Sequence, residues 1–101
     1  MKRGTTPTLS ISVEGVELSY LKDIYISVKQ DNNIITKTGE HITIDNDSGT
    51  IGVYLTQDET LSFRPGYVFI QLRAATTGGN VIASDVQQIS IDEILQEGAI
   101  T

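Results

Sequence analysis

Apolar residues recur at every second position in several short segments of the chain. In the segment 23–30, isoleucine and valine alternate with tyrosine, serine and lysine. The same period of two occurs in 8–13, 50–55 and 67–75. A helix does not gather residues spaced by two on one face, whereas a strand with one buried side does. These four segments therefore predict β-strands that each bury one face.

Weaker alternation in 34–38, 41–45 and 81–91 brings the number of expected strands to about seven. Polar segments rich in Asn, Asp and Gly, at 31–33, 45–49 and 77–80, have the composition of hairpin turns. Short strands joined by such turns favour two sheets packed face to face. We therefore expect an all-β fold, an antiparallel two-sheet sandwich of about seven strands with immunoglobulin-like architecture.

Two segments depart from simple alternation. Residues 16–22 fit either a strand, because Val16, Leu18 and Tyr20 alternate, or a short turn capped by Ser19. Within 81–91 the apolar residues change parity midway. A slip of one residue turns every following side chain to the other face, so we expect a β-bulge near 87–88.

Thr56 and Glu59 have the spacing of a capping box, in which each side chain accepts a hydrogen bond from the other residue's backbone amide. The pattern predicts one helical turn between the two sheets, with Leu61 or Phe63 plugging the end of the core. The acidic pair Asp58-Glu59 then stabilises the start of that helix and has no catalytic task.

Ser90 and Glu93 repeat the capping-box spacing near the end of the chain, and Gly98 follows at the position of a helix C-cap. The pattern predicts a short C-terminal helix over 91–98, with the acidic pair Asp92-Glu93 in its first turn. The helix would carry Ile94 and Leu95 as an apolar pair that either packs on a neighbour or covers its own core.

The composition limits the classes of protein to consider. A chain of 101 residues forms one domain, here with an extended polar N-terminal arm at 1–7. That arm either docks along the sheet edge of another subunit or frays. The net charge of −6 disfavours nucleic acid as a partner. The absence of cysteine fits a reducing compartment or a protein assembled before it leaves one, and we expect neither a signal peptide nor a membrane span.

No residues are spaced as a catalytic or metal site requires. His41 is the one histidine of the sequence, and no nucleophile motif accompanies it. The turn 45–49 begins like a calcium loop, but Thr56 stands where an EF-hand needs its bidentate glutamate. We therefore expect no enzymatic activity, no metal and no cofactor.

Four aromatic residues, Tyr25, Tyr54, Tyr67 and Phe69, have the polar parity of their strands and so belong on an outer sheet face. An outward aromatic cluster can form a protein contact surface. Cross-strand aromatic pairs that only stiffen a sheet give the same pattern, so both interpretations stay open. Together with Ile94 and Leu95, these residues are the candidate interaction surface.

Five segments carry a resemblance to known proteins, at 2–9, 23–30, 55–61, 66–72 and 91–98. Together they resemble a group of small proteins encoded in prophage regions of Gram-positive bacteria. The order of strands is also similar to that of the N-terminal β-sandwich of phage baseplate upper proteins. The likeness covers nearly the whole chain, although this chain shows no long helical linker or receptor-binding domain after the sandwich. Its shared motifs are structural ones.

The resemblance implies a phage or prophage virion structural protein, associated with the tail or baseplate and made in the bacterial cytoplasm. Such a protein acts by docking onto other phage structural proteins, and we expect a homo-oligomer, since symmetric association is how such modules work. The alternative is a small carbohydrate- or peptide-binding β-sandwich module. The low content of aromatic residues, 6%, counts mildly against that alternative.

Overall fold

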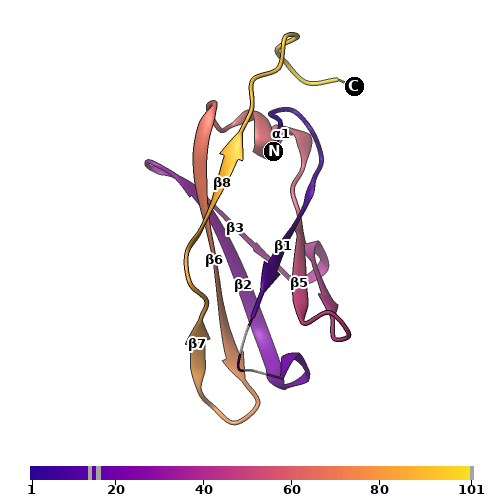
Figure 1. The fold of residues 1–101 in the computed structure, drawn as a ribbon, viewed down its shortest axis with the longest axis vertical. Helices are drawn as coiled ribbons and strands as arrows, with labels where there is room; N and C mark the ends of the chain where they lie inside the picture. The colour runs from indigo at the N-terminus through magenta and orange to yellow at the C-terminus, as the bar shows by residue number, and fades with distance from the viewer. Residues whose placement is uncertain (14, 16, 101) are drawn as a thin grey trace.

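The fold was obtained as a computed structural model, which describes residues 1–13, 15 and 17–100. In that part of the chain two sheets face each other (Figure 1). The small sheet has the order β1 (Thr8–Ser12), β5 (Thr50–Tyr54), β4 (Ile42–Asp45). The large sheet has the order β3 (Asn33–Thr38), β2 (Leu21–Gln30), β6 (Gly66–Thr76), with β7 (Val81–Ala83) and β8 (Gln87–Ile91) both paired with β6.

The all-β prediction is confirmed, and all the strand pairs are antiparallel. Within the described residues, three short helical segments connect the strands: η1 (Leu18–Tyr20), η2 (Gly39–His41) and α1 (Gln57–Leu61). The ambiguous segment 16–22 therefore contains a turn of helix followed by the start of β2, while the part of that prediction at Val16 lies outside the described residues.

The seventh expected strand is interrupted, as its change of parity indicated. Ala83 lies opposite Arg73, whereas Gln87 lies opposite Ile70. Three residues, 84–86, thus face two residues of β6, and the break lies slightly before the expected position at 87–88. Ser84 bridges it, because its amide donates to the Leu72 carbonyl at 2.9 Å and its hydroxyl accepts from the Leu72 amide at 3.0 Å.

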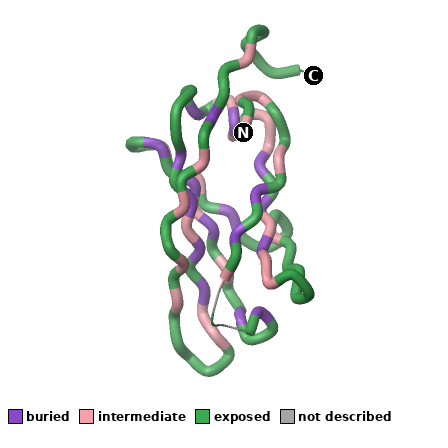
Figure 2. Tube along the Cα trace, in the orientation of Figure 1, coloured by how far each residue is buried: buried purple, intermediate pink, exposed green. Residues whose placement is uncertain are grey.

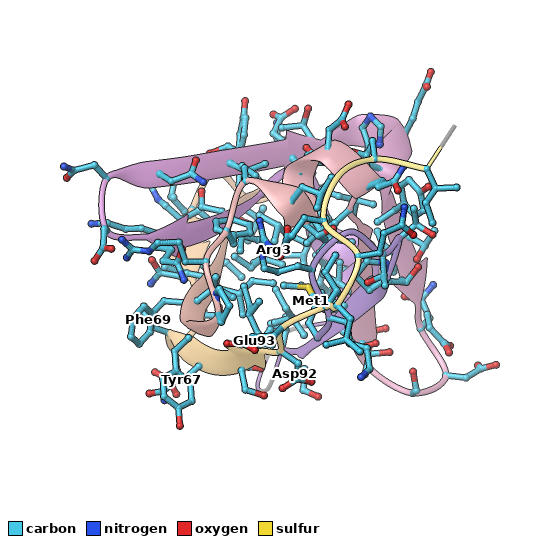
Figure 3. All side chains as sticks on the ribbon, turned by 90° about the horizontal axis from the view of Figure 1, so that it is seen from above. Met1, Arg3, Tyr67, Phe69, Asp92 and Glu93 are labelled. Carbon is cyan, nitrogen blue, oxygen red and sulfur yellow. The ribbon has the colours of Figure 1, made fainter. Side chains whose placement is uncertain are left out.

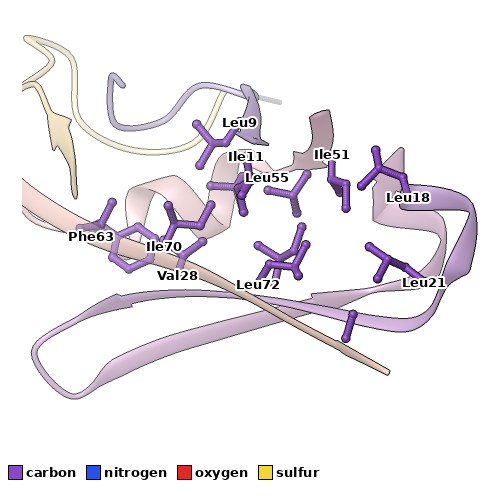
Figure 4. Close-up of a cluster of buried hydrophobic side chains, with 14 of the residues drawn as sticks. Leu9, Ile11, Leu18, Leu21, Val28, Ile51, Leu55, Phe63, Ile70 and Leu72 are labelled. Atoms are coloured by element: carbon purple, nitrogen blue, oxygen red, sulfur yellow. The ribbon is translucent and has the colours of Figure 1, made fainter. Parts of the chain in front are cut away.

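One apolar core lies between the sheets (Figure 4). Along β5 and β6 buried residues alternate with more exposed ones, as the period of two predicted (Figure 2). The residues of the core are Leu9, Ile11, Leu18, Leu21, Ile26, Val28, Ile51, Val53, Leu55, Phe63, Val68, Ile70, Leu72, Ala74 and Ile91. Phe63 is fully buried and Leu61 only partly, so Phe63 is the plug at the end of the core.

A buried amide fastens the loop after α1 to the end of β2. The Gln30 side chain donates to the carbonyls of Arg64 at 2.9 Å and Tyr67 at 3.2 Å, and it accepts from the Arg64 amide at 2.8 Å. Gln30 also pairs with Asn33, which closes a turn at Asp31-Asn32. The expected hairpin at 31–33 is present, with the positive φ of 51° at Asp31.

The capping box of α1 is confirmed. The Glu59 amide donates to the Thr56 hydroxyl at 3.2 Å, and the Thr56 amide donates to the Glu59 carboxylate at 2.8 Å. The same carboxylate accepts from the ammonium of Lys37 on β3 at 2.7 Å, and the Lys37 side chain is only 7% exposed. Burial alone would raise the pKa of Glu59, but hydrogen bonds from Lys37 and Thr56 outweigh it and lower the pKa below 4.5.

The N-terminal arm is held by its own chain. Lys2 forms a parallel bridge with Asp92, where the Arg3 amide donates to the Asp92 carbonyl at 3.3 Å. Further along, the Thr60 hydroxyl donates to the Thr5 carbonyl at 2.8 Å, and the Leu55 amide donates to the Pro7 carbonyl at 3.0 Å. In the structure residues 1–7 therefore lie along their own chain, and docking of the arm on another subunit stays a prediction.

The C-terminal helix expected over 91–98 is not confirmed. Ser90 and Ile91 belong to β8, where they lie opposite Tyr67 and Gly66, and the Asp92 amide donates to the Met1 carbonyl at 2.7 Å. These backbone bonds require an extended chain, so the Ser90–Glu93 capping box does not form. Residues 93–100 follow an irregular path that leaves the end of the sandwich (Figure 1).

Arg3 ties the arm to two other segments. Its guanidinium donates to the carbonyls of Phe63 at 2.6 Å and Leu61 at 3.0 Å, and it forms an ion pair with Glu97. The carbonyl of Leu61 belongs to the last residue of α1, where a positive charge is favourable. One side chain thus joins the N-terminal arm, the end of α1 and the C-terminal segment.

We expect Arg3→Ala to lower the free energy of unfolding by about 2–3 kcal/mol, because two partly buried carbonyls and a carboxylate lose a charged donor. Urea denaturation followed by circular dichroism measures the change. Lys2→Ala is the matched control: Lys2 is exposed and should change stability by less than about 0.5 kcal/mol. Equal effects of the two substitutions would contradict this role of Arg3.

The ion pair of Lys37 and Glu59 predicts a dependence of stability on pH. Because folding lowers the pKa of Glu59, this site stabilises the protein above about pH 4.5 and loses that contribution as the pH falls through the folded pKa. Urea denaturation from pH 7 to pH 3 should therefore give a flatter profile for Glu59→Gln than for the wild type. Asp58→Asn, next to it in α1, should retain the wild-type slope. Parallel profiles for all three proteins would contradict the assignment.

Candidate interaction surface

The outer face of the large sheet brings together side chains from β2, β3 and β6. Strand register places Tyr25 between Thr38 and Arg73, and Lys29 between Ile34 and Phe69. Residues directly opposite each other on neighbouring strands are close enough for side-chain contact. The face thus presents aromatic and aliphatic groups in rows with basic side chains.

Four residues at one end of this face form what we call the aromatic patch: Ile34, Lys29, Phe69 and Tyr67. Tyr67 is 57% exposed, Ile34 56% and Phe69 45%. Tyr67 and Phe69 lie two positions apart on β6, and both point away from the body of the protein (Figure 3). Because Phe69 and Ile34 flank Lys29, the patch combines apolar area with a positive charge.

Tyr25 lies in a different part of the same face. Arg73, opposite Tyr25, is four residues from Phe69 along β6, which corresponds to about 13 Å. Tyr25 lines a shallow hollow of about 550 Å³ together with Asp23, Ser27, Thr36, Arg73, Ala74, Ala75 and Val81. Asp23 adopts a positive φ of 50° where the pairing of β2 with β6 shifts register, so a bulge turns a carboxylate toward this hollow.

Tyr54 is exposed as expected, but it belongs to the other sheet. It lies on β5 opposite Thr8 of β1, and Val53 and Leu55 on either side of it are buried. Its side chain is therefore on the outer face of the small sheet. Tyr25, Tyr67 and Phe69 share one face, and Tyr54 does not join them.

Ile94 and Leu95 point in different directions. The Cδ1 atom of Ile94 lies near Gly4, where a Cβ on the glycine would approach it to 3.1 Å. Leu95 is fully exposed, at 103% of its reference area. The segment that carries them is fixed at its far end, because Gln57 and Ile100 exchange hydrogen bonds of 2.7 and 2.9 Å. Ile94 thus covers its own chain, and Leu95 remains free for a contact.

Ile34, Lys29 and Arg73 were not predicted as surface residues of interest. The hairpin at 31–33 could have identified Ile34, because a turn that pairs Gln30 with Asn33 sets Ile34 opposite Lys29. The positions of Phe69 and Arg73 beside β2 depend on pairing between segments some 40 residues apart. No local pattern in the sequence carries that information.

The other residues considered for chemistry have structural surroundings. His41 is exposed at the end of η2. The amides of Asp47 and Ser48 donate to the Asp45 carboxylate at 3.1 and 3.3 Å, as in a polar turn. Hydrogen bonding from Ser48, and then from the Asp47 amide, lowers the pKa of Asp45.

Nowhere in residues 1–13, 15 and 17–100 do three or more His, Asp or Glu side chains come together in a way that could hold a metal ion. The one α-helix in the described ranges, α1, has five residues, so none of the helices there could span a lipid bilayer. The buried polar side chains are hydrogen-bonded within the described ranges. The exposed sheet face is therefore the strongest candidate site.

Phe69→Ser should change the free energy of unfolding by less than about 1 kcal/mol, because only cross-strand contact on an outer face is lost. Val68→Ser, at the next position, should cost more than about 2 kcal/mol, because it removes a fully buried side chain and buries a hydroxyl. Thermal and urea denaturation compare the two variants. A large loss for Phe69→Ser would favour the alternative that the outward aromatics only stiffen the sheet.

The comparisons with known proteins give no information about this surface. Comparison of the chain with models of protein families and with curated proteins gives no match. The interpretation of the site therefore depends on its own geometry, on the exposed rows of β2, β3 and β6.

Proposed function

We propose that this chain is a virion structural protein of a phage or prophage, associated with the tail or baseplate, that acts by docking onto other phage structural proteins. The observation that carries the proposal is the aromatic patch on a sheet whose other face forms the core. Tyr67 and Phe69 contribute little to the interior, yet they are held on the same strand as buried Val68 and Ile70. Aromatic residues on a rigid face are typical of protein interfaces.

We propose further that the two sheets form an immunoglobulin-like sandwich. In that architecture the strands B, E and D lie in one sheet, and C′, C, F and G lie in the other. We name β1 strand B and the later strands C, C′, D, E and F in chain order, with β7 and β8 together as G. The orders β1-β5-β4 and β3-β2-β6-β7/β8 then correspond to these two sets. This correspondence supports the immunoglobulin-like assignment.

The positions of the ion pairs support docking through the outer face of the large sheet. The ion pairs of Arg3 and Lys37 lie at α1 and the chain ends, and that of Arg64 lies at the turn after β2, so none of them uses a side chain of the outer rows of β2 and β6. The outer face is therefore free to contact other phage structural proteins or further copies of the chain. On this proposal the protein is made in the bacterial cytoplasm, has no enzymatic activity and takes its place in the virion with the other structural proteins.

A second candidate function, a small carbohydrate- or peptide-binding module, is favoured by the hollow beside Tyr25. One aromatic ring, the guanidinium of Arg73 and the carboxylate of Asp23 line it, and such groups can pack on a sugar ring and hydrogen-bond its hydroxyls. Tyr25 is the one aromatic residue that lines this hollow. Binding of a panel of glycans or peptides that Tyr25→Ala abolishes and Tyr67→Ala preserves would establish this candidate instead.

The proposed function is tested in the bacterium that encodes the chain. We expect phage particles released by prophage induction to contain the protein, as detected by mass spectrometry of purified virions. Deletion of its gene should reduce the yield of infectious particles by at least about tenfold, and the wild-type gene should restore it. A yield unchanged by the deletion, or purified virions without the protein, would overturn the proposal.

Substitutions then test the docking surface. Tyr67→Ser with Phe69→Ser should fail to restore infectious particles although the protein folds, because the contact area on the outer face is lost. Tyr54→Ser, a matched exposed tyrosine on the opposite sheet, should restore them. Full restoration by the Tyr67/Phe69 variant would exclude the aromatic patch as the docking surface.

A further inference from the structure

Basic side chains are concentrated on one face of this acidic chain. Of its seven Lys and Arg residues, Arg3, Lys37 and Arg64 form ion pairs in the described part of the chain. Of the other four, Lys22, Lys29 and Arg73 lie on the outer face of the large sheet. Lys22 is opposite Ala75, and Lys29 and Arg73 are opposite Phe69 and Tyr25.

That face carries little compensating negative charge. Asp23, at the bulge, is its one acidic residue among the described strand positions. The protein as a whole has a net charge of −6, so the remaining surface is strongly acidic. Two such faces placed against each other would bring the basic side chains of the two copies near one another. A symmetric face-to-face contact is therefore unfavourable, and an acidic partner surface is favoured.

The same chain offers an acidic and apolar counterpart at its C-terminal end, in a segment that we call the Leu95 loop, residues 92–97. Leu95 is fully exposed, and Asp92 and Glu93 beside it are exposed as well. The loop extends beyond the end of the sandwich (Figure 1).

The loop is anchored at both ends, which distinguishes it from a loose tail. On one side the backbone of Asp92 exchanges hydrogen bonds with Met1 and Arg3. On the other side Glu97 forms its ion pair with the Arg3 guanidinium, and Ile100 is bound by Gln57. A leucine presented on an anchored segment loses little conformational entropy when it binds.

We propose that the chain associates with a second copy of itself, the Leu95 loop of one copy docking on the aromatic patch of the other. Leu95 packs between Tyr67, Phe69 and Ile34, and Asp92 and Glu93 face Lys29. The loop begins directly after Ile91, which lies opposite Gly66 and next to Tyr67, so the loop and the patch lie at the same end of the molecule. A contact in one direction is heterologous and can propagate into a ring or a filament, whereas a reciprocal exchange of both loops closes a two-fold dimer. The inference does not require the virion role, because it concerns the purified chain alone.

Sedimentation velocity of the purified full chain tests the proposal. A contact of one loop on a small patch is weak, and we expect a dissociation constant on the order of 0.1 mM in 20 mM salt. Raising the salt to 500 mM should weaken association several-fold, because opposite charges are screened. A chain that remains monomeric up to about 1 mM in low salt would overturn the proposal, whatever the outcome of the prophage experiment.

Two single substitutions separate the two sides of the contact. Lys29→Glu and Leu95→Ala should each weaken association at least about tenfold. Both residues are exposed, and circular dichroism and thermal denaturation confirm that the variants fold. Tyr54→Ala, on the opposite sheet, should associate like the wild type. Association that Lys29→Glu abolishes and Leu95→Ala leaves intact would assign the patch to another acidic surface and overturn the role of the loop.

Mixing the two variants provides a sharper test. The Lys29→Glu protein retains an intact loop and the Leu95→Ala protein an intact patch, so an equimolar mixture should form a dimer although neither variant associates alone. That mixture should form mainly dimers, because the remaining loop and patch are each weakened at least about tenfold. The double variant Lys29→Glu/Glu93→Lys should regain association through the reversed charge pair. Failure of both the mixture and the charge reversal would overturn the contact between the loop and the patch.

Discussion

The antiparallel pairing of β2 with β6 is the constraint on which the rest of the molecule depends. These are the two longest of the described strands, and their register joins Leu21 to Thr76 at one end and Lys29 to Phe69 at the other. Side chains on a strand alternate between faces, so this one register sets both sides of the sheet at once. Ile26 and Val28 are directed into the core with Leu72 and Ile70, and the exposed rows are arranged on the opposite side.

The polar anchors of the fold gather around α1 and the two ends of the chain, where strand pairing alone leaves backbone groups without partners. The Gln30 side chain donates to a backbone carbonyl of the loop after α1. Lys37 forms an ion pair with Glu59 of the α1 capping box, and Arg3 donates to the carbonyl of Leu61 at the end of α1. Each side chain bonds to a segment distant in sequence. These anchors lie beside the core, whereas the outer face of the large sheet carries few side-chain hydrogen bonds, such as that between the Ser27 and Thr36 hydroxyls at 3.0 Å.

The sequence pattern predicted the strands and α1, which are determined by residues close together in the chain. Alternation located the strands, and Thr56 with Glu59 predicted α1 because the capping box involves residues three apart. The same spacing failed at Ser90 and Glu93, where pairing of Ser90 with Tyr67 overrides helix formation. The anchors were not predictable, since Arg3 finds its carbonyl 60 residues away and Gln30 its amide partner 34 residues away. Parity showed that Tyr54 faces outward but could not show on which sheet.

The parallel pairing of the N-terminal arm with the end of β8 has a mechanical consequence. Residues 1–3 and 90–92 run in the same direction, so tension that separates the two chain ends slides one segment past the other. The backbone bonds between them and the Arg3–Glu97 ion pair then bear the load together, rather than opening one after another as in a hairpin pulled apart at its tips. A sandwich closed in this way resists pulling along its length and gives way more readily to force applied across it.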